Sequence, residues 1–584
     1  MNRRKGLKKL FNRFAAGALL SFGLIAGGNV RADEPQQTPA AAFVEAAAPS
    51  GAPVCEAFPG FAEPLVPMHR AARVEIEPDP AVRTRQQLLR RIGMDPGPAD
   101  GLPGRATASA SREYLMFYAP LYDGNASAAT LNETDVTQLT HYADLALTDA
   151  RAKGIRTSTA AALRMASERT GADFNALVTA ARRGGHLQGV RGTNASASDL
   201  FKYDTASWLY LVKTYGDKYG LGLYANAITL EQTEDGKTVP GVSNPFLYRQ
   251  LLELKHHPRL SALMAGEYLV NAPDMSNVRP PALPAFDATV QQQQRDLAAI
   301  GFDTGAADGI KGTYSFISIG EFQMIYGDGV ATGTLSEDEA ALLKKTAARA
   351  RLEGKTFRAP SAATGAIRMA SERSAQDFGY MMELASAESG FRVTARAGTT
   401  SATGLYQFIE STWAWMIKLH GARYGLGDLA KEVEIYTDDL GRRQARIPNP
   451  IARGQIMDLR HNPHLSSLFS AHFQQENEAK EACWVSGELS RTDLYIAHFL
   501  GAHDAVYFLN PLREDPQKSA PATFPNAAEY NENIFWVMQN GQRLRERTLQ
   551  EVYDHFERKF DRNLYDAPSD PLVKGPDPNF PTIG

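Results

Sequence analysis

The clearest hydrophobic pattern of the chain predicts a helix that begins near Phe378. Apolar residues recur with helical period at Phe378, Met381 and Ala385, so they share one face. Glu388 projects from the same side, in the last turn before Gly390, a residue that commonly ends helices. A carboxyl group on an apolar face costs free energy unless it is paired or used. Glu388 is therefore the first candidate functional residue.

Several short segments occur twice, which shows that the chain contains an internal repeat. Residues 163–169, with the sequence LRMASER, recur as residues 367–373, with the sequence IRMASER. The further matches are residues 92–101 with 300–309, Trp208 with Trp413, residues 219–222 with 424–427, Asn244-Pro245 with Asn449-Pro450, and His256 and Pro258 with His461 and Pro463. The sequence thus predicts a mainly α-helical protein in which a small module and a larger module occur in two copies.

The two small modules share glycines and Asp-Gly pairs between short helical runs. The first has Gly93, Asp95, Gly97, Asp100, Gly101 and Gly104, and the second has Gly301, Asp303, Gly305, Asp308, Gly309 and Gly312. Asp-Gly pairs provide the turn chemistry and left-handed backbone that tight connections need. The spacing resembles the type 1 peptidoglycan-binding domain, a bundle of three short helices. The resemblance implies docking on the cell wall through weak, linked sites. Alternatively, most of these residues only build turns.

The second large module carries three further segments in a fixed order. They are residues 388–391 (ESGF), 404–408 (GLYQF) and 497–502 (AHFLGA). Over roughly residues 366–560 they resemble the signature of soluble-lytic-transglycosylase-type, lysozyme-like domains. The third segment departs from the family's pattern, because His498 stands where the family usually carries Tyr and Phe499 where it carries Asn.

The resemblance implies a glycan-cleaving site around Glu388. The substrate contacts that it implies are Ser389, Tyr406, Gln407, His498 and Phe499. Pairing between amides suits an N-acetylated sugar, which favours Gln407. Ser389 and Tyr406 have structural alternatives, as a hydroxyl at a helix end and as a packed core residue. His498 replaces a tyrosine whose hydrogen bond the family expects, and we assign it to substrate contact.

The chemistry needs a proton at the leaving oxygen of the β-1,4 bond between N-acetylmuramic acid (MurNAc) and N-acetylglucosamine (GlcNAc), where an oxocarbenium-like centre develops. A carboxylic acid supplies this proton well where its surroundings disfavour ionisation, as on an apolar helix face. The resembled family uses one glutamate first as acid and then as base, while the C6 hydroxyl of MurNAc attacks. The product is 1,6-anhydroMurNAc, and no water is consumed. In this chain that glutamate is Glu388.

Two other functions are open from the sequence. A hydrolytic muramidase needs a second carboxylate, for which Glu410 and the Asp438-Asp439 pair are candidates. A non-catalytic wall-binding scaffold would leave Glu388 unused. Trp413 and Trp415 are candidates for stacking on sugar rings, although the repeat partner of Trp413 favours core packing for that residue.

The first large module is predicted to be inactive. The matched positions are Glu388 with Gly184 and Gln407 with Lys202, and the last of the three segments has no counterpart. A glycine side chain cannot transfer a proton. We expect this module either to keep a glycan groove or to brace the active half. Its basic residues, which suit an anionic ligand or a solvated turn, are Arg182, Arg183 and His186.

The N-terminus has the pattern of a secretory signal peptide. Basic residues within positions 3–9 precede an apolar run at 14–28 and a small residue at Ala32. We therefore expect a periplasmic, wall-associated protein, with an uncleaved anchor as the alternative. The predicted segments are a signal peptide at 1–32, a disordered linker at 33–80, small modules at 81–150 and 291–350, the inactive module at 155–275, a Pro-rich linker at 276–290, the catalytic module at 360–562 and a disordered tail at 563–584.

Composition adds few constraints. The 584 residues are 43% hydrophobic and 22% charged with a net charge of −4, so nothing favours nucleic acid over the expected partner, peptidoglycan. We expect no cofactor and no metal, because no carboxylate completes a ligand set with His461 and His464. The two cysteines, Cys55 and Cys483, either pair in an exported protein or stay as thiols.

Overall fold

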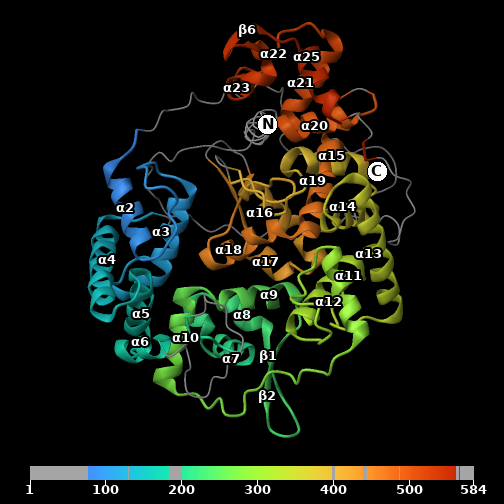
Figure 1. Cartoon of the computed structure of the whole chain (residues 1–584). Coiled ribbons are helices and arrows are strands. Elements are labelled where there is room, and N and C mark those ends of the chain that lie inside the picture. The colour runs from blue at the N-terminus through green and yellow to red at the C-terminus, as the bar shows by residue number, and fades with distance from the viewer. Residues whose placement is uncertain are drawn as a thin grey trace, which may run out of the picture. The chain divides into compact units, whose positions relative to one another are not determined.

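The computed structural model describes residues 77–128, 130–182, 200–397, 401–438, 443–485, 487–560 and 564–565. Within these residues the protein is mainly helical and its sheets are short antiparallel hairpins (Figure 1). The prediction of a mainly α-helical fold is confirmed. None of the described helices combines the length and the apolar content needed to cross a membrane. The predicted signal peptide, and nearly all of the first linker and of the tail, lie outside the described residues.

The described chain forms two compact units, which we describe separately. The first compact unit contains the described residues up to Ala348 together with Ser411–Leu459. We call it the repeat unit, because it holds the first copy and part of the second. The Glu388 unit contains Arg349–Glu410 and the described residues from Arg460 onward. The segment Ser411–Leu459 of the predicted catalytic module thus belongs to the repeat unit.

Each small module contributes three helices in sequence. The helices of the first are α2 (Pro80–Arg91), α3 (Arg105–Tyr118) and α4 (Glu133–Lys153), and those of the second are α11 (Ala288–Ala299), α12 (Thr313–Tyr326) and α13 (Glu337–Phe357). A buried glutamine holds the Asp-Gly turn in both modules. Gln86 donates to Asp100 Oδ1 (3.2 Å) and accepts from the backbone N–H of Gly101 (3.0 Å). The matched Gln294 makes the same two bonds at 3.0 and 2.8 Å.

The glycines of these turns need a left-handed backbone. Gly101 and Gly309 have φ angles of 84° and 75°, a region that glycine enters without steric cost. The prediction that the Asp-Gly pairs build turns is confirmed, and binding of the cell wall by these modules stays a prediction.

The two large modules follow the same order of elements. The first has α5 (Thr157–Thr170), α6 (Phe174–Arg182), α7 (Thr205–Tyr215), α8 (Gly222–Ala227), β1 (Ile228–Gln232), β2 (Thr238–Val242), α9 (Pro245–Leu254) and α10 (Pro258–Asn271). The second has α14 (Ser361–Ser374), α15 (Phe378–Ser389), α16 (Glu410–His420), α17 (Gly427–Lys431), β3 (Glu434–Thr437), β4 (Arg443–Arg446), α18 (Pro450–Asp458) and α19 (Pro463–Trp484). Short 3₁₀ turns, η3 (Gly216–Tyr219) and η4 (Gly421–Tyr424), follow α7 and α16.

The repeat also extends to individual interactions. Trp208 and Trp413 are fully buried, and their indole N–H groups donate to the carbonyls of Leu251 (2.7 Å) and Ile456 (2.8 Å), which are matched positions. Because Trp413 is enclosed in this way, the prediction that it packs in the core is confirmed.

The second copy continues into a C-terminal extension that the first copy lacks. It comprises α20 (Arg491–Leu500), α21 (Ala502–Glu514), α22 (Ala520–Thr523), α23 (Pro525–Tyr530), α24 (Glu532–Phe535), β5 (Trp536–Gln539), β6 (Gln542–Glu546) and α25 (Leu549–Phe560). Helix α25 packs against α15 and α20, and the Phe560 ring stacks on Tyr495 with 3.8 Å between centroids.

The sequence pattern predicts two helices over residues 527–560, and this is wrong in the middle of the segment. Residues 536–546 form the hairpin β5–β6 instead. Its turn is Asn540-Gly541, and both residues have positive φ (52° and 80°). Asn-Gly is the strongest short hairpin signal, because both residues tolerate the left-handed backbone of a tight turn.

Helix α19 of the Glu388 unit carries an unusual buried polar face. Its members are Ser467, Ser470, Gln474, Asn477 and Glu481, all of them buried. Glu481 has no exposed surface, and neither of its carboxyl oxygens has a hydrogen-bond partner in the described part of the chain. Burial, followed by the nearby carboxylates of Asp493 and Glu478, raises the pKa of Glu481 from 4.5 to about 9. Glu481 is therefore protonated at neutral pH.

We expect Glu481→Gln to stabilise the protein, increasingly so at alkaline pH. The pKa of Glu481 is raised in the folded state, so the free energy of unfolding falls as pH rises from 4.5 through about 9. Glutamine keeps the shape and does not ionise. The melting temperature of the variant should exceed that of the wild type by about 2–6 °C at pH 8 and by little at pH 5. A difference that is the same at both pH values would contradict the assignment.

Candidate active site

Glu388 lies in the last turn of α15, and Gly390 ends the helix in the left-handed conformation with φ 59°. The helix and its end are as predicted. The glutamate side chain is only 3% exposed, and its Oε1 atom lies 3.3 Å from Nε2 of His498 on α20. An imidazole at this distance gives the buried carboxyl group a partner that can accept or donate a proton.

His498 is held in place by aromatic neighbours. Its ring stacks near Tyr495 (5.9 Å between centroids) and meets Phe473 edge-on (6.4 Å). The sequence assigns His498 to substrate contact, whereas the structure places its ring against Glu388. Substrate contact by His498 stays a prediction, and the imidazole stands where the resemblance expects a tyrosine hydroxyl.

The loop before α16 is stabilised by hydrogen bonds between its own residues. Gln407 adopts a left-handed backbone (φ 52°), and its side-chain amide donates to the carbonyls of Ala395 (3.2 Å) and Gly404 (2.9 Å). Its nitrogen thus serves the loop, and the residue is buried. Contact of Gln407 with substrate stays a prediction.

Arg460 holds the same loop and was not predicted. It is buried, and Nη1 donates to the carbonyls of Ser401 (2.6 Å) and Phe408 (3.1 Å). Gly404 passes so close that a Cβ atom there would lie 2.1 Å from the Arg460 carbonyl oxygen. No local sequence signal identifies Arg460, because its partners lie far away in the chain.

The other three predicted substrate contacts also have internal partners. The Ser389 hydroxyl donates to the Ala385 carbonyl one turn back in α15 (3.1 Å). The buried Tyr406 hydroxyl donates to the Met381 carbonyl (3.1 Å), and burial raises the pKa of Tyr406. Buried Phe499 packs on Phe556, with 5.1 Å between ring centroids. These placements favour the structural alternatives for Ser389 and Tyr406, and contact of all three with substrate stays a prediction.

The candidate second carboxylates lie in different settings. Glu410 begins α16, and its backbone N–H donates to Ser401 Oγ (3.3 Å). Asp438 belongs to the repeat unit, follows β3 and accepts from Gln444 (3.3 Å), whereas Asp439 lies outside the described residues. Glu388 itself lies beside the imidazole of His498.

The remaining candidate residues have local roles. His461 uses both ring nitrogens, one toward the Val393 carbonyl (3.0 Å) and one toward Arg396 (3.2 Å), and His464 is fully buried. Within the described ranges, no three His, Cys, Asp or Glu side chains are grouped so that they could hold a metal ion. The Arg443 guanidinium lies over the Trp415 ring at 5.3 Å. Cys483 is in a disulfide, and Cys55 lies outside the described residues.

The first copy keeps the backbone of the site at one described position. Lys202 has a positive φ of 47°, as its match Gln407 does with 52°. Arg182 ends α6, whereas Arg183, Gly184 and His186 lie outside the described residues. Lys202 thus keeps the left-handed backbone of this position but has no side-chain amide.

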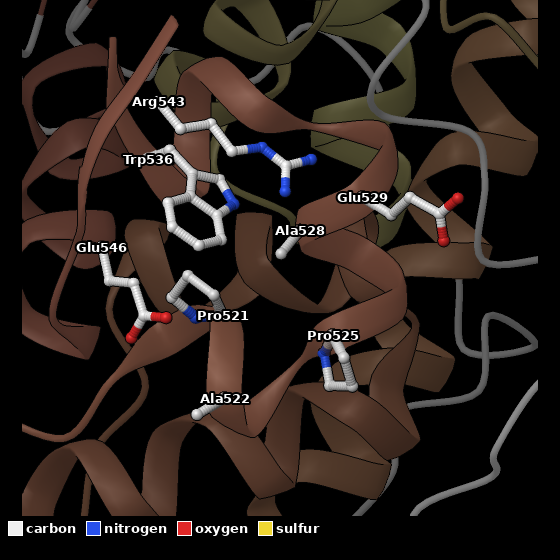
Figure 2. Close-up of a pocket in the computed structure, with 8 residues that line it drawn as sticks. All are labelled: Pro521, Ala522, Pro525, Ala528, Glu529, Trp536, Arg543 and Glu546. Atoms are coloured by element: carbon white, nitrogen blue, oxygen red, sulfur yellow. The ribbon is translucent and has the colours of Figure 1, made fainter.

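A pocket lies in the C-terminal extension (Figure 2). Its lining residues are Pro521, Ala522, Pro525, Ala528, Glu529, Trp536, Arg543 and Glu546. Figure 2 shows the Arg543 guanidinium beside the Trp536 ring, 4.8 Å from its centroid. None of the predicted site residues lines this pocket.

No protein-family model matches this chain. The resemblance to lytic transglycosylases therefore depends only on the sequence segments named above.

We expect Gly404→Ala to destabilise the site loop strongly. Alanine would have to adopt a φ of 86° and place its Cβ against the Arg460 carbonyl. The free energy of unfolding should fall by about 3–5 kcal/mol in urea denaturation. Gly390→Ala is the matched control, because its φ is 59° and nothing lies within 4 Å of its Cβ position. Its loss should be about 1–2 kcal/mol, and equal losses would contradict the role of Gly404.

Proposed function

We propose that this protein is a peptidoglycan lytic transglycosylase in which Glu388 is the general acid and base. The observation that supports this most is the position of Glu388. It is 97% buried at the end of an apolar helix and has an imidazole at 3.3 Å. A buried carboxyl group held beside a titratable side chain is a frequent arrangement for proton transfer.

The proposed reaction needs one carboxyl group used twice. Protonated Glu388 donates its proton to the oxygen of the leaving GlcNAc as the MurNAc C1–O bond breaks. The resulting carboxylate then takes the proton of the MurNAc C6 hydroxyl, whose oxygen bonds to C1. The products are a 1,6-anhydroMurNAc end and a free GlcNAc 4-hydroxyl, and Glu388 is protonated again. No water and no second carboxylate enter this sequence.

His498 supports both steps in this proposal. Depending on its tautomer, the imidazole can accept a hydrogen bond from the protonated carboxyl group or donate its own N–H to the carboxylate. It thereby orients the Glu388 side chain in both protonation states. Gln407 would offer its carbonyl oxygen to the N–H of an N-acetyl group.

In this proposal the small modules bind the cell wall and the first large module has no catalytic activity. The two three-helix modules would dock on glycan and raise the local substrate concentration through linked weak sites. The second large module would have the lysozyme-like arrangement, and the first would be inert. A signal peptide at 1–32 would direct the protein to the periplasm.

Mass spectrometry of the muropeptides released from purified peptidoglycan tests this function. The wild-type protein should release anhydro products, and Glu388→Gln should lower the rate by about 10²–10⁴-fold, because glutamine cannot transfer the proton. Glu410→Gln is the control and should keep the anhydro products. Reducing-end products that vanish in Glu410→Gln would instead establish a hydrolytic muramidase. Wall binding without release by any variant would establish a scaffold.

The role of His498 is tested by two substitutions that keep its volume roughly filled. We expect His498→Phe to lower kcat/KM by about 10-fold or more, because the carboxyl group loses the polar imidazole nitrogen at 3.3 Å. His498→Tyr should retain more activity, since a hydroxyl can replace the imidazole nitrogen. Equal rates for the wild type and His498→Phe would remove this histidine from the mechanism.

A further inference from the structure

The repeat unit contains reciprocal contacts between the two copies. The side-chain amide of Asn244 in the first copy donates to the carbonyl of Gly425 in the second (2.6 Å). The matched Asn449 of the second copy donates to the carbonyl of Gly220 in the first (2.9 Å). Gly220 and Gly425 are themselves matched positions. Such exchanged contacts are the mark of an isologous interface, in which two like surfaces meet about a two-fold axis.

A contact between equivalent residues places the axis. The Gln250 side chain donates to the backbone carbonyl of Gln455 (3.4 Å), and these two residues are matched in the repeat. In a two-fold arrangement, equivalent residues meet each other only close to the axis. Residues from α9 and α18 therefore lie at the centre of this internal interface.

Each small module also contributes to the interface between the two copies, by contacting the large module of the other copy. Helix α12 of the second small module packs against α9 of the first copy, and α3 of the first small module packs against α18 of the second copy. Arg453 on α18 donates to Ser109 Oγ on α3 (2.7 Å). Each small module thus contacts the large module of the other copy.

One of these crossed contacts contains a buried ion pair. Arg249 on α9 donates to both carboxyl oxygens of Glu321 on α12, at 2.7 and 2.9 Å, and to the Asp303 carbonyl at 3.1 Å. The Glu321 side chain is 2% exposed. A bidentate pair of this kind fixes geometry, and removing the arginine would leave a buried carboxylate alone.

The turns that contain Gly220 and Gly425 also pack closely against the small modules of their own copies. A Cβ atom at Gly220 would lie 2.4 Å from Met116 Cε, and one at Gly425 would lie 3.1 Å from Met324 Sδ. The two methionines are matched positions of α3 and α12. Each turn is therefore enclosed by its own small module and by the asparagine of the other copy.

We propose that the first copy acts as the built-in second subunit of a two-fold pair, and that its role is to hold Ser411–Leu459 of the second copy through this interface. A copy that has lost catalytic residues can still serve this role, because the contacts use asparagine amides, backbone carbonyls and Arg249. The proposal does not depend on glycan cleavage.

The test separates the copies within the full chain. Residues 279–289 are exposed, so a recognition sequence for a site-specific protease inserted after Ala282 should be cut in the folded protein. Size-exclusion chromatography of the cut protein is run under reducing conditions, because Cys483 is in a disulfide. We expect the two fragments to elute together at micromolar concentration. Separate elution of two folded fragments would overturn the proposal.

Interface variants show whether these contacts hold the fragments. In the cut protein, Arg249→Met should weaken association by about 100-fold or more, and the pair Asn244→Ala with Asn449→Ala by about 10-fold or more. The asparagine pair keeps the test informative if Arg249→Met fails to fold. The control is Arg91→Ala, which removes an exposed ion pair with Asp144 inside the first small module. Association unchanged in both interface variants, or weakened equally in the control, would overturn the proposal.

Discussion

Burial of a carboxyl group at the end of an apolar helix is the constraint on which the Glu388 unit depends. Such a group has to be paired, neutral or in use. The carboxyl group of Glu388 on α15 lies beside His498, and the His498 ring packs against Tyr495 and Phe473. The C-terminal extension supports this arrangement, because α25 packs on α15 and α20, the two helices that present the glutamate and the histidine.

The two copies share structural features but differ at the proposed catalytic position. Both keep the buried tryptophan with its carbonyl partner, the capping asparagine before α9 or α18, and a left-handed residue at position 202 or 407. These features are local or lie in the core, where a change costs stability. The position of Glu388, which we propose to transfer the proton, is not part of these shared features, and the first copy has glycine at the matched position. Its retained surfaces instead meet the second copy in the repeat unit.

The sequence predicts whatever depends on short-range pattern. The helix that carries Glu388 follows from its apolar period and from Gly390, and the duplicated order of elements follows from the matched segments. Core burial of Trp413 follows from its match to Trp208. Hairpin β5–β6 had a short-range signal in Asn540-Gly541, but the apolar residues around it also fit helices.

Contacts between distant segments could not be predicted in this way. The pairing of His498 with Glu388 and the bonds from Arg460 to the loop carbonyls join parts of the chain that no periodicity connects. The raised pKa of Glu481 depends on burial by several helices, and sequence spacing does not reveal it. For Tyr406 the local pattern could not decide between core and substrate, because an aromatic residue suits both.

A crystal structure of Glu388→Gln with a bound glycan of alternating GlcNAc and MurNAc would test the proposed role of Glu388 most directly. The substitution keeps the shape of the site and prevents turnover. We predict that the oxygen of a MurNAc–GlcNAc bond lies within hydrogen-bonding distance of the residue 388 amide. The MurNAc C6 hydroxyl should lie close to C1, and the residue 498 side chain should lie beside residue 388. A glycan seated elsewhere, for example in the pocket beside Trp536, with the 388 side chain still enclosed, would contradict it.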